Sequence, residues 1–222
     1  MSAVEQIPVV PSATDAAWLD ALAEAGHAAV RRHAFDAGAQ LLRRGAPMTH
    51  VFIVLDGVVR ISRETRSGHT RIVGLALAGD TFACDALASG LYGGDAHAAC
   101  RSAVAAVDPR RWVDAAARDA RLPALDALAS VQMARMMRQD SRLRLTAAAR
   151  VADFLLQLIE RDGSDVVELP VACKDVANHL DLRAETMSRM LRRLAELDAL
   201  RRLAPTRYQV DAERLRQIRA TH

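Results

Sequence analysis

The stretch that decides the fold is Cys173-Lys-Asp-Val-Ala-Asn-His-Leu-Asp-Leu-Arg-Ala-Glu-Thr-Met-Ser-Arg-Met-Leu-Arg192. Its apolar side chains recur where two helices that cross steeply over a tight turn need them: Val176, Leu180, Leu182, Met187 and Met190. The small Ala177 allows the second helix to approach the first closely. The turn falls near Asp181, and aspartate is one of the few residues besides glycine that tolerate a left-handed backbone. The stretch therefore predicts a helix-turn-helix.

The second helix of this pair carries a surface suited to reading DNA. Its outward-pointing side chains are Arg183, Glu185, Thr186, Ser188, Arg189, Arg192 and Arg193. Arginine can bind guanine O6 and N7 with two parallel hydrogen bonds, glutamate accepts from cytosine N4, and serine suits either edge. Arg192 and Arg193, at the far end, suit phosphates. Double-stranded DNA is the expected partner. The competing interpretation is a helical hairpin with solvated charges, because isolated helix-turn-helix matches are often false.

The flanking sequence supports a winged form of this motif. Thr146 is a suitable cap for an amphipathic helix that stops at Asp162-Gly163, and Val166 to Pro170 predicts a short strand. After the motif, Leu200 to Leu203 and Tyr208 to Val210 predict a β-hairpin, the wing. We expect a winged helix-turn-helix domain over residues 146–222.

Upstream lies a predicted dimerisation helix, residues 121–145. Its seam alternates in steps of three and four and is apolar at five of seven positions: Leu122, Leu125, Ala129, Gln132, Met136, Gln139 and Leu143. A second copy of the chain is the natural cover for this seam, so we expect a homodimer. The alternative is a helix wholly buried within one monomer.

The first part of the chain has a different texture. Short apolar stretches separated by glycine-bearing turns run from Arg31 to Val107, which favours a sandwich or barrel of antiparallel strands. The Asp56-Gly57 pair between two apolar stretches predicts a hairpin there. We expect residues 1–120 to form a sensor domain with an N-terminal helix, in a chain of the α+β class.

Composition excludes several functions. The 222 residues carry a net charge of only +3, which alone does not indicate a nucleic-acid protein. Since no secretory signal and no apolar stretch of about 18 residues occurs, we expect a cytoplasmic protein without membrane contact. Three cysteines without a C-x-x-C pair indicate neither a disulfide framework nor a metal site. No catalytic residues are predicted, because no nucleophile–base pair, phosphate loop or H-E-x-x-H motif appears.

The chain resembles the Crp/Fnr superfamily over nearly its whole length. The resemblance rests on four segments: Glu168-Leu-Pro-Val through Arg189-Met-Leu-Arg-Arg-Leu, Leu55-Asp-Gly-Val-Val-Arg60, Ala78-Gly-Asp-Thr-Phe82, and Asp85-Ala-Leu-Ala-Ser-Gly90. The last two are similar to the Fnr-branch pattern G-D-x-x-G-F-D-A-I-x-S-G. The resemblance implies a β-roll of the cyclic-nucleotide-binding type, a long dimer helix and a winged domain. It implies transcription regulation with RNA polymerase as a partner, and TTGAT-like half-sites in which Glu185 and Arg189 read the G·C pair and Ser188 a thymine.

The resemblance leaves the effector unknown. The residues expected near an effector pocket are Cys84, Asp85, His97 and Arg101. Cyclic AMP is not expected, because the Arg-Ser pair that binds the phosphate in that branch is absent from its expected place, and the only nearby arginine, Arg101, is displaced from it. An iron–sulfur cluster is not expected, because no cysteine precedes Cys84. Haem, as in the Dnr type, and thiol chemistry at Cys84 or Cys100 stay open. The alternative function is a ligand-binding module whose helical C-terminus makes protein–protein contacts.

Overall fold

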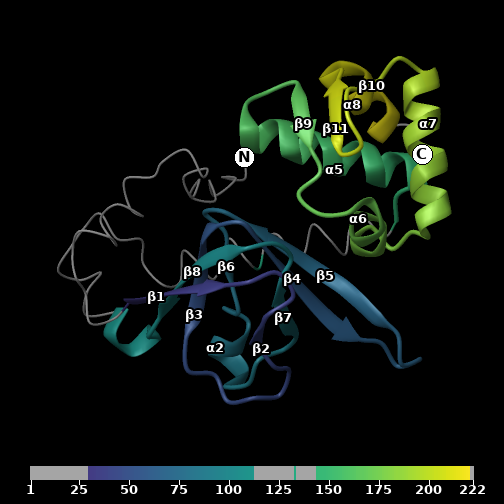
Figure 1. The fold of residues 1–222 in the computed structure, drawn as a ribbon. Coiled ribbons are helices and arrows are strands. Elements are labelled where there is room, and N and C mark those ends of the chain that lie inside the picture. The colour runs from purple at the N-terminus through teal and green to yellow at the C-terminus, as the bar shows by residue number, and fades with distance from the viewer. Residues whose placement is uncertain (1–29, 113–132, 134–143, 221–222) are drawn as a thin grey trace, which may run out of the picture. The chain divides into compact units, whose positions relative to one another are not determined.

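The computed structural model describes residues 30–112, 133 and 144–220 (Figure 1). The chain divides into two compact units, Met1–Val59 with Ala76–Arg135 and Arg60–Leu75 with Met136–His222. The predicted N-terminal helix and nearly all of the predicted dimerisation helix lie outside the described residues, so both stay predictions.

The N-terminal part is built from short strands. In chain order the elements are β1 (Val30–Phe35), β2 (Gln40–Leu42), β3 (Val51–Asp56), β4 (Val58–Glu64), β5 (Thr70–Leu77), β6 (Thr81–Phe82), α2 (Ala86–Ser89), β7 (Asp95–Ala98) and β8 (Ser102–Val107). They form two four-stranded sheets, ordered β1-β8-β3-β6 and β2-β7-β4-β5. β8 pairs antiparallel with β1 and β3, and β7 pairs antiparallel with β2. The antiparallel β-roll predicted from the sequence is confirmed.

One predicted pairing is wrong. Asp56-Gly57 does not close a hairpin, because β3 and β4 belong to different sheets. The dipeptide does make a left-handed turn, with φ +79° at Gly57, but this turn is a corner between the sheets. A β-carbon at Gly57 would lie 2.6 Å from the Arg101 carbonyl oxygen and would also clash with Ser102 Oγ. The Ser102 hydroxyl accepts from the Val58 N–H at 3.1 Å and donates to the Cys100 carbonyl at 2.9 Å.

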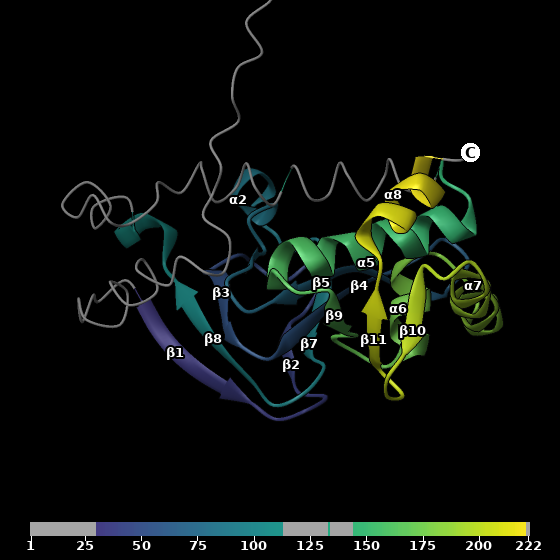
Figure 2. The ribbon, with the colours of Figure 1, turned by 90° about the horizontal axis from the view of Figure 1, so that it is seen from above.

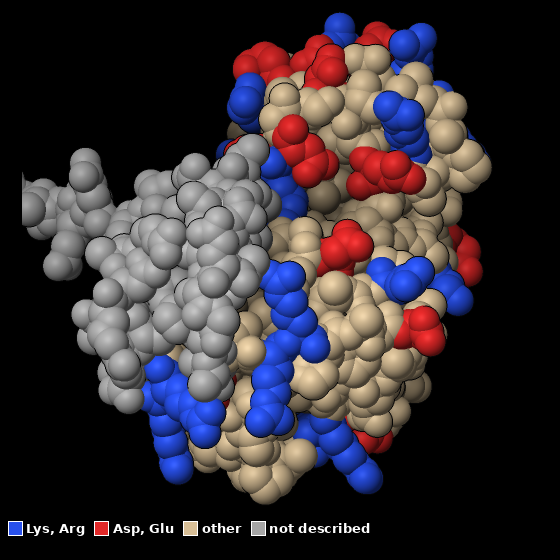
Figure 3. Space-filling view, turned by 60° about the vertical axis from the view of Figure 1, so that its left-hand side comes forward, with Lys and Arg blue, Asp and Glu red and all other residues tan. Residues whose placement is uncertain are grey.

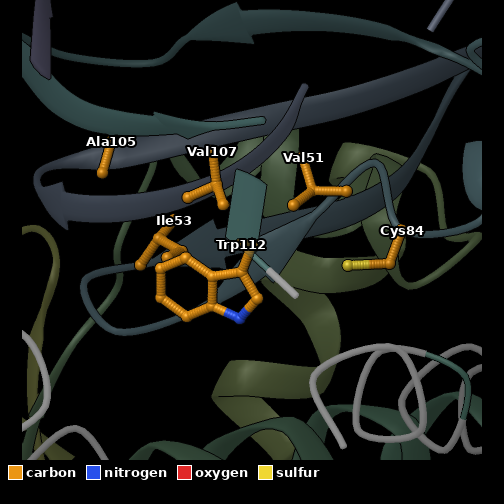
Figure 4. Close-up of a cluster of buried hydrophobic side chains, with 6 residues drawn as sticks. All are labelled: Val51, Ile53, Cys84, Ala105, Val107 and Trp112. Atoms are coloured by element: carbon orange, nitrogen blue, oxygen red, sulfur yellow. The ribbon is translucent and has the colours of Figure 1, made fainter. Parts of the chain in front are cut away.

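The core of this part lies between strands β3 and β8 and the helical turn that follows β8. Residues 109–112 are helical, and the Asp108 carboxylate accepts from the Arg110 N–H at 3.0 Å. This turn buries Trp112 completely. Its indole lies beside Ile53, and the Cys84 sulfur is directed into the same space (Figure 4). The full cluster is Val51, Ile53, Cys84, Ala105, Val107 and Trp112.

The C-terminal part is a winged helix domain (Figures 1 and 2). Its elements are α5 (Ala147–Asp162), β9 (Val166–Glu168), α6 (Cys173–His179), α7 (Ala184–Glu196), β10 (Leu200–Arg202), β11 (Arg207–Val210) and α8 (Ala212–Ala220). The strands form one antiparallel sheet ordered β10-β11-β9. The predicted strand, helix pair and wing are therefore confirmed. α8 was not predicted; it packs against α5 through the fully buried Leu215, and Arg219 bonds Asp153 at 3.3 Å.

The second unit also includes residues 60–75, the far part of β4 and β5. Within this unit, the Asn178 side chain on α6 accepts from the Ile72 N–H at 2.6 Å and donates to the Thr70 carbonyl at 3.2 Å. One turn earlier on α6, Asp175 pairs with Arg60 at 2.8 Å. The side-chain amide of Asn178 thus satisfies backbone groups of β5 as a neighbouring strand would.

Candidate nucleic-acid interface

The domain that carries the candidate site rests on α5. The Thr146 hydroxyl accepts from the Ala149 N–H at 3.3 Å and caps the helix, and Gly163 ends it with φ +63°. Both ends agree with the sequence prediction. The apolar stripe of α5 is buried, with Val151 and Leu155 fully inaccessible to solvent. The helix-turn-helix packs against this stripe.

The turn between α6 and α7 has the predicted geometry. Asp181 adopts a left-handed conformation, φ +57°. The Leu182 N–H reaches back to the Ala177 carbonyl at 2.9 Å, and Ala177 is fully buried, as close approach of the two helices requires. Of the predicted angle-filling residues, Val176, Leu180 and Met187 are buried, whereas Leu182 and Met190 are half-buried.

α7 separates its side chains into two faces. Met187, Leu191 and Leu194 are buried, at spacings of four and three residues. The exposed predicted residues are Arg183, Glu185, Ser188, Arg189, Arg192 and Arg193, and Thr186 is half-buried. Glu185, Ser188, Arg189 and Arg192 follow the i, i+3, i+4, i+7 rule, so they share one face of the helix. This exposed face, here called the recognition surface, carries the side chains that are predicted to read DNA.

The charge of this region is local. Between Arg183 and Arg202 the chain has six arginines against Glu185, Glu196 and Asp198. Arg193 lies 3.9 Å from Glu196 in an exposed pair, which is a weak interaction in water. The face of the molecule in Figure 3 carries both basic and acidic side chains, in keeping with the small net charge.

The wing adds arginines that the sequence interpretation did not assign to a function. Arg201, Arg202 and Arg207 are all exposed. Arg202 stabilises the wing turn, with Nε and Nη2 donating to the carbonyls of Ala204 and Pro205 at 3.2 and 3.3 Å. The signal for these residues was visible in the sequence, since basic side chains on a hairpin after a recognition helix are placed for phosphates.

Two thiols and a phenol have altered pKa values. Burial raises the pKa of the Cys84 thiol from 9.0 to about 12, partly offset by a hydrogen bond with Thr81. Burial also raises the pKa of Cys173, at the start of α6, and of Tyr208 in β11, while the Arg202 charge lowers both.

The residues predicted for an effector pocket occupy different surroundings. Cys84 is in the apolar cluster around Trp112, and Asp85 is half-buried beside it in the chain. His97 is half-buried on β7, in the sheet ordered β2-β7-β4-β5, where it pairs with Gln40 of β2. Arg101 is exposed in the turn between β7 and β8. The pocket itself stays a prediction.

The dimer seam stays a prediction as well. All seven of its residues, Leu122 to Leu143, lie outside the described residues. In the described part of the chain, no helix has the length and apolar character needed to cross a membrane.

Comparison with known proteins finds the same two modules. Residues 32–119 match the family described as the cyclic nucleotide-binding domain, and residues 149–218 match the Crp-like helix-turn-helix domain. The nitrogen fixation regulation protein FixK of Azorhizobium caulinodans is 32% identical over 157 residues, which cover 66% of this chain and 62% of that protein. The protein of the same name from Bradyrhizobium diazoefficiens is 30% identical over 198 residues, which cover 86% of this chain and 81% of that protein.

The solved structures give the same result. The structure of FixK2 from Bradyrhizobium japonicum matches with a TM-score of 0.76 and 25% identity, and the match covers 87% of this chain and 98% of that one. A transcriptional regulator of the CRP family from Thermus thermophilus matches with a TM-score of 0.65 and 22% identity, covering 85% of this chain and 97% of that one, which supports the fold.

Proposed function

Because the chain belongs to the Crp/Fnr family of transcription regulators, we propose that it binds a DNA palindrome as a homodimer in the cytoplasm. The observation that carries this proposal is the recognition surface of α7. Glu185, Ser188 and Arg189 are exposed on one face, while Met187 and Leu191 anchor the opposite face in the core. An α-helix held in this way fits the major groove, where base edges are distinguishable.

The three exposed side chains have distinct proposed roles. Arg189 donates two hydrogen bonds to guanine, Glu185 accepts from the paired cytosine, and Ser188 contacts a thymine. The half-site that the resemblance to the Fnr branch implies for these three residues is TTGAT-like. Arg192 and Arg193 bind phosphates and fix the register of the helix. The exposed Arg201 and Arg207 of the wing are further candidates for phosphate contacts.

Alanine substitution separates base reading from phosphate binding. Arg189→Ala or Glu185→Ala should cost about 1–3 kcal/mol on the palindrome and relax the preference at the G·C pair. Arg193→Ala, the matched control, should weaken binding to all duplexes alike and reduce the slope of log K against log salt by about 1. Fluorescence anisotropy with cognate and random duplexes over a salt series measures both effects.

Equal loss on cognate and random DNA for Arg189→Ala would contradict the base assignment. A sequence-selection experiment with random palindromes tests the proposal as a whole. If no duplex is enriched, the alternative is favoured, in which the helical C-terminus makes protein–protein contacts. RNA polymerase is the expected partner once the site is bound, and co-purification on promoter DNA tests that step.

For the β-roll we propose a small effector other than a cyclic nucleotide. A buried cyclic phosphate needs a charged donor, and the exposed position of Arg101 does not favour that role. Haem is the candidate that the resemblance to the Dnr type supplies, with the half-buried His50 and His97 as candidate ligands among the described residues. Titration with haemin tests it. A Soret shift lost in His97→Ala supports haem, whereas no shift, or calorimetric binding of cyclic AMP, contradicts this proposal.

A further inference from the structure

One arginine of α5 joins two distant points of the DNA-binding domain. The Arg150 guanidinium donates from Nε to the Leu145 carbonyl at 3.0 Å. Its Nη1 donates to the carbonyls of Leu180 and Asp181 at 3.2 and 3.3 Å. Leu145 immediately precedes the cap of α5, where the chain enters the domain. Leu180 and Asp181 form the turn that precedes the recognition helix. The two points are 35 residues apart in the chain and meet at this side chain.

The carbonyls concerned need an external donor. Leu180 ends α6, so no further helical N–H is available to its carbonyl, and the left-handed backbone of Asp181 directs its carbonyl out of the helical path. A charged donor makes a stronger hydrogen bond than a neutral one. The planar guanidinium of arginine can donate to the Leu145 carbonyl and to the carbonyls of the turn at the same time, whereas the single ammonium of lysine cannot reproduce this geometry.

The turn determines where α7 points. The Leu182 N–H bonds the Ala177 carbonyl, and the Met187 N–H bonds the Arg183 carbonyl, so the residue that follows Leu182 already belongs to the hydrogen bonding of the first turn of α7. The buried Val176, Ala177 and Met187 hold the two helices together. These three residues do not cover the turn itself, which lies at the edge of the core, where Asp181 is exposed.

We propose that Arg150 is a positioning residue for the recognition helix. It ties the turn before α7 to the start of α5, and so couples the entry of the chain into the domain to the direction of Glu185 and Arg189. The expected effect of Arg150 on DNA binding rests on the proposed function. The tether itself, by which we mean the hydrogen bonds from Arg150 to Leu145, Leu180 and Asp181, does not depend on that function.

Two substitutions of Arg150 and a matched control test the proposal. Arg150→Met removes the donors, and Arg150→Lys keeps the charge. The control is Arg219→Met, which removes an arginine that also bonds α5, through Asp153, but from α8. We expect Arg150→Met to weaken binding to the selected palindrome about 10- to 100-fold and binding to random DNA much less. Arg150→Lys should recover part of this loss, and Arg219→Met should bind as the wild type.

The salt dependence distinguishes positioning from direct contact. A positioning residue leaves the slope of log K against log salt unchanged, because no phosphate contact is lost. If Arg150→Met weakens both duplexes equally and flattens the slope by about 1, Arg150 is a phosphate contact and the inference is wrong. Unchanged affinity for the palindrome would overturn it as well.

Hydrogen exchange tests the tether without DNA. Amides of residues 180–184 should exchange at least several-fold faster in Arg150→Met, and less so in Arg150→Lys, with residues 51–56 of β3 unchanged as an internal control. If the wild type fails to prefer any palindrome but this local exchange increases, the proposed function fails and the tether stands. Unchanged exchange at 180–184 overturns the tether. Should Arg150→Met fail to fold, Arg150→Lys gives the same comparison.

Discussion

Among the described residues, Ala83, Asp181 and Asp198 have positive φ angles without being glycine. A side chain with a β-carbon costs roughly 1–2 kcal/mol in the left-handed region. Ala83, with φ +67°, stands where the Fnr-branch pattern G-D-x-x-G has its second glycine. Asp181, with φ +57°, stands where glycine is usual in the helix-turn-helix turn. Both positions depart from the family pattern, and both have the left-handed φ that glycine accepts most readily.

Asp181→Gly should raise the free energy of unfolding by up to about 1 kcal/mol, since glycine accepts this φ without strain. The loss of the aspartate side chain should cost little stability, because its carboxylate lies 3.8 Å from Arg71 Nε and is half exposed. Urea unfolding measures the change. Asp181→Ala is the control and should be no more stable than the wild type. A glycine variant less stable than the alanine variant would contradict the argument.

Cys84 is a poor candidate for thiol sensing at neutral pH. The residue is 5% exposed, and burial raises the pKa of its thiol to about 12. The reactive thiolate is then only about one part in ten thousand at pH 8. Alkylation of the folded protein at pH 8 should label the exposed Cys100 and leave Cys84 unlabelled. Mass spectrometry of the peptides checks this, and comparable labelling of the two residues would contradict it.

The same pKa shift predicts a loss of stability at alkaline pH. Below pH 9 the thiol of Cys84 is protonated in both the folded and the unfolded chain, so its ionisation does not affect stability. Between pH 9 and 12 only the unfolded chain ionises, which lowers the free energy of unfolding by up to about 1.4 kcal/mol per pH unit. Urea unfolding at pH 8 and 10.5 should therefore show a larger drop for the wild type than for Cys84→Ala. Cys173 and Tyr208 shift in the same direction and remain in both proteins.

At the scale of elements, the corner between β3 and β4 depends on one glycine. Gly57→Ala should lower the free energy of unfolding by about 2 kcal/mol or more, because it adds a positive-φ penalty to a clash with the backbone carbonyl of Arg101. Thermal unfolding measures the loss. Gly163→Ala, also at positive φ but with open space around the added carbon, is the control and should lose less. Equal losses would show that the close approach to Arg101 is unimportant.

Which elements could be predicted follows from how local their signals are. The cap at Thr146, the stop at Gly163, the turn at Asp181 and the buried face of α7 depend on neighbours within one or two helical turns. The elements of the winged domain other than α8 could therefore be predicted from the sequence. Partner choice among strands is not local. Asp56-Gly57 correctly indicated a turn, but β3 is buried on both faces and pairs with β8 and β6 rather than β4.

The two missed features, α8 and the contact of Arg150, have different physical causes. α8 is nine residues long and mostly polar, with Leu215 as its fully buried residue, so its apolar period is too weak to identify alone. The tether from Arg150 to the turn depends on the path of the chain over 30 residues. The outward side chains of α7 were predictable because helical periodicity alone decides which face the core takes.

At the scale of the whole molecule, the proposed function needs two copies of α7. A palindrome presents its half-sites about one double-helical turn apart, so a dimer gains affinity from the second half-site through effective concentration. We propose that the seam predicted at Leu122 to Leu143 supplies the second copy. One of its predicted positions, Ala129, is small and would face its own counterpart across a twofold axis.

Ala129→Glu should convert the protein into a monomer, because it places two carboxylates against each other at the seam. Sedimentation should give about twice 24.1 kDa for the wild type and the single-chain mass for the variant. Affinity for the full palindrome should fall at least about 100-fold, toward the value for a single half-site, while half-site affinity stays the same. Ala220→Glu, at the exposed end of α8, changes the net charge equally and should leave both mass and affinity unchanged. A variant that stays dimeric would show that the seam lies elsewhere. A wild type that binds a half-site as tightly as the palindrome would show that one copy of α7 suffices.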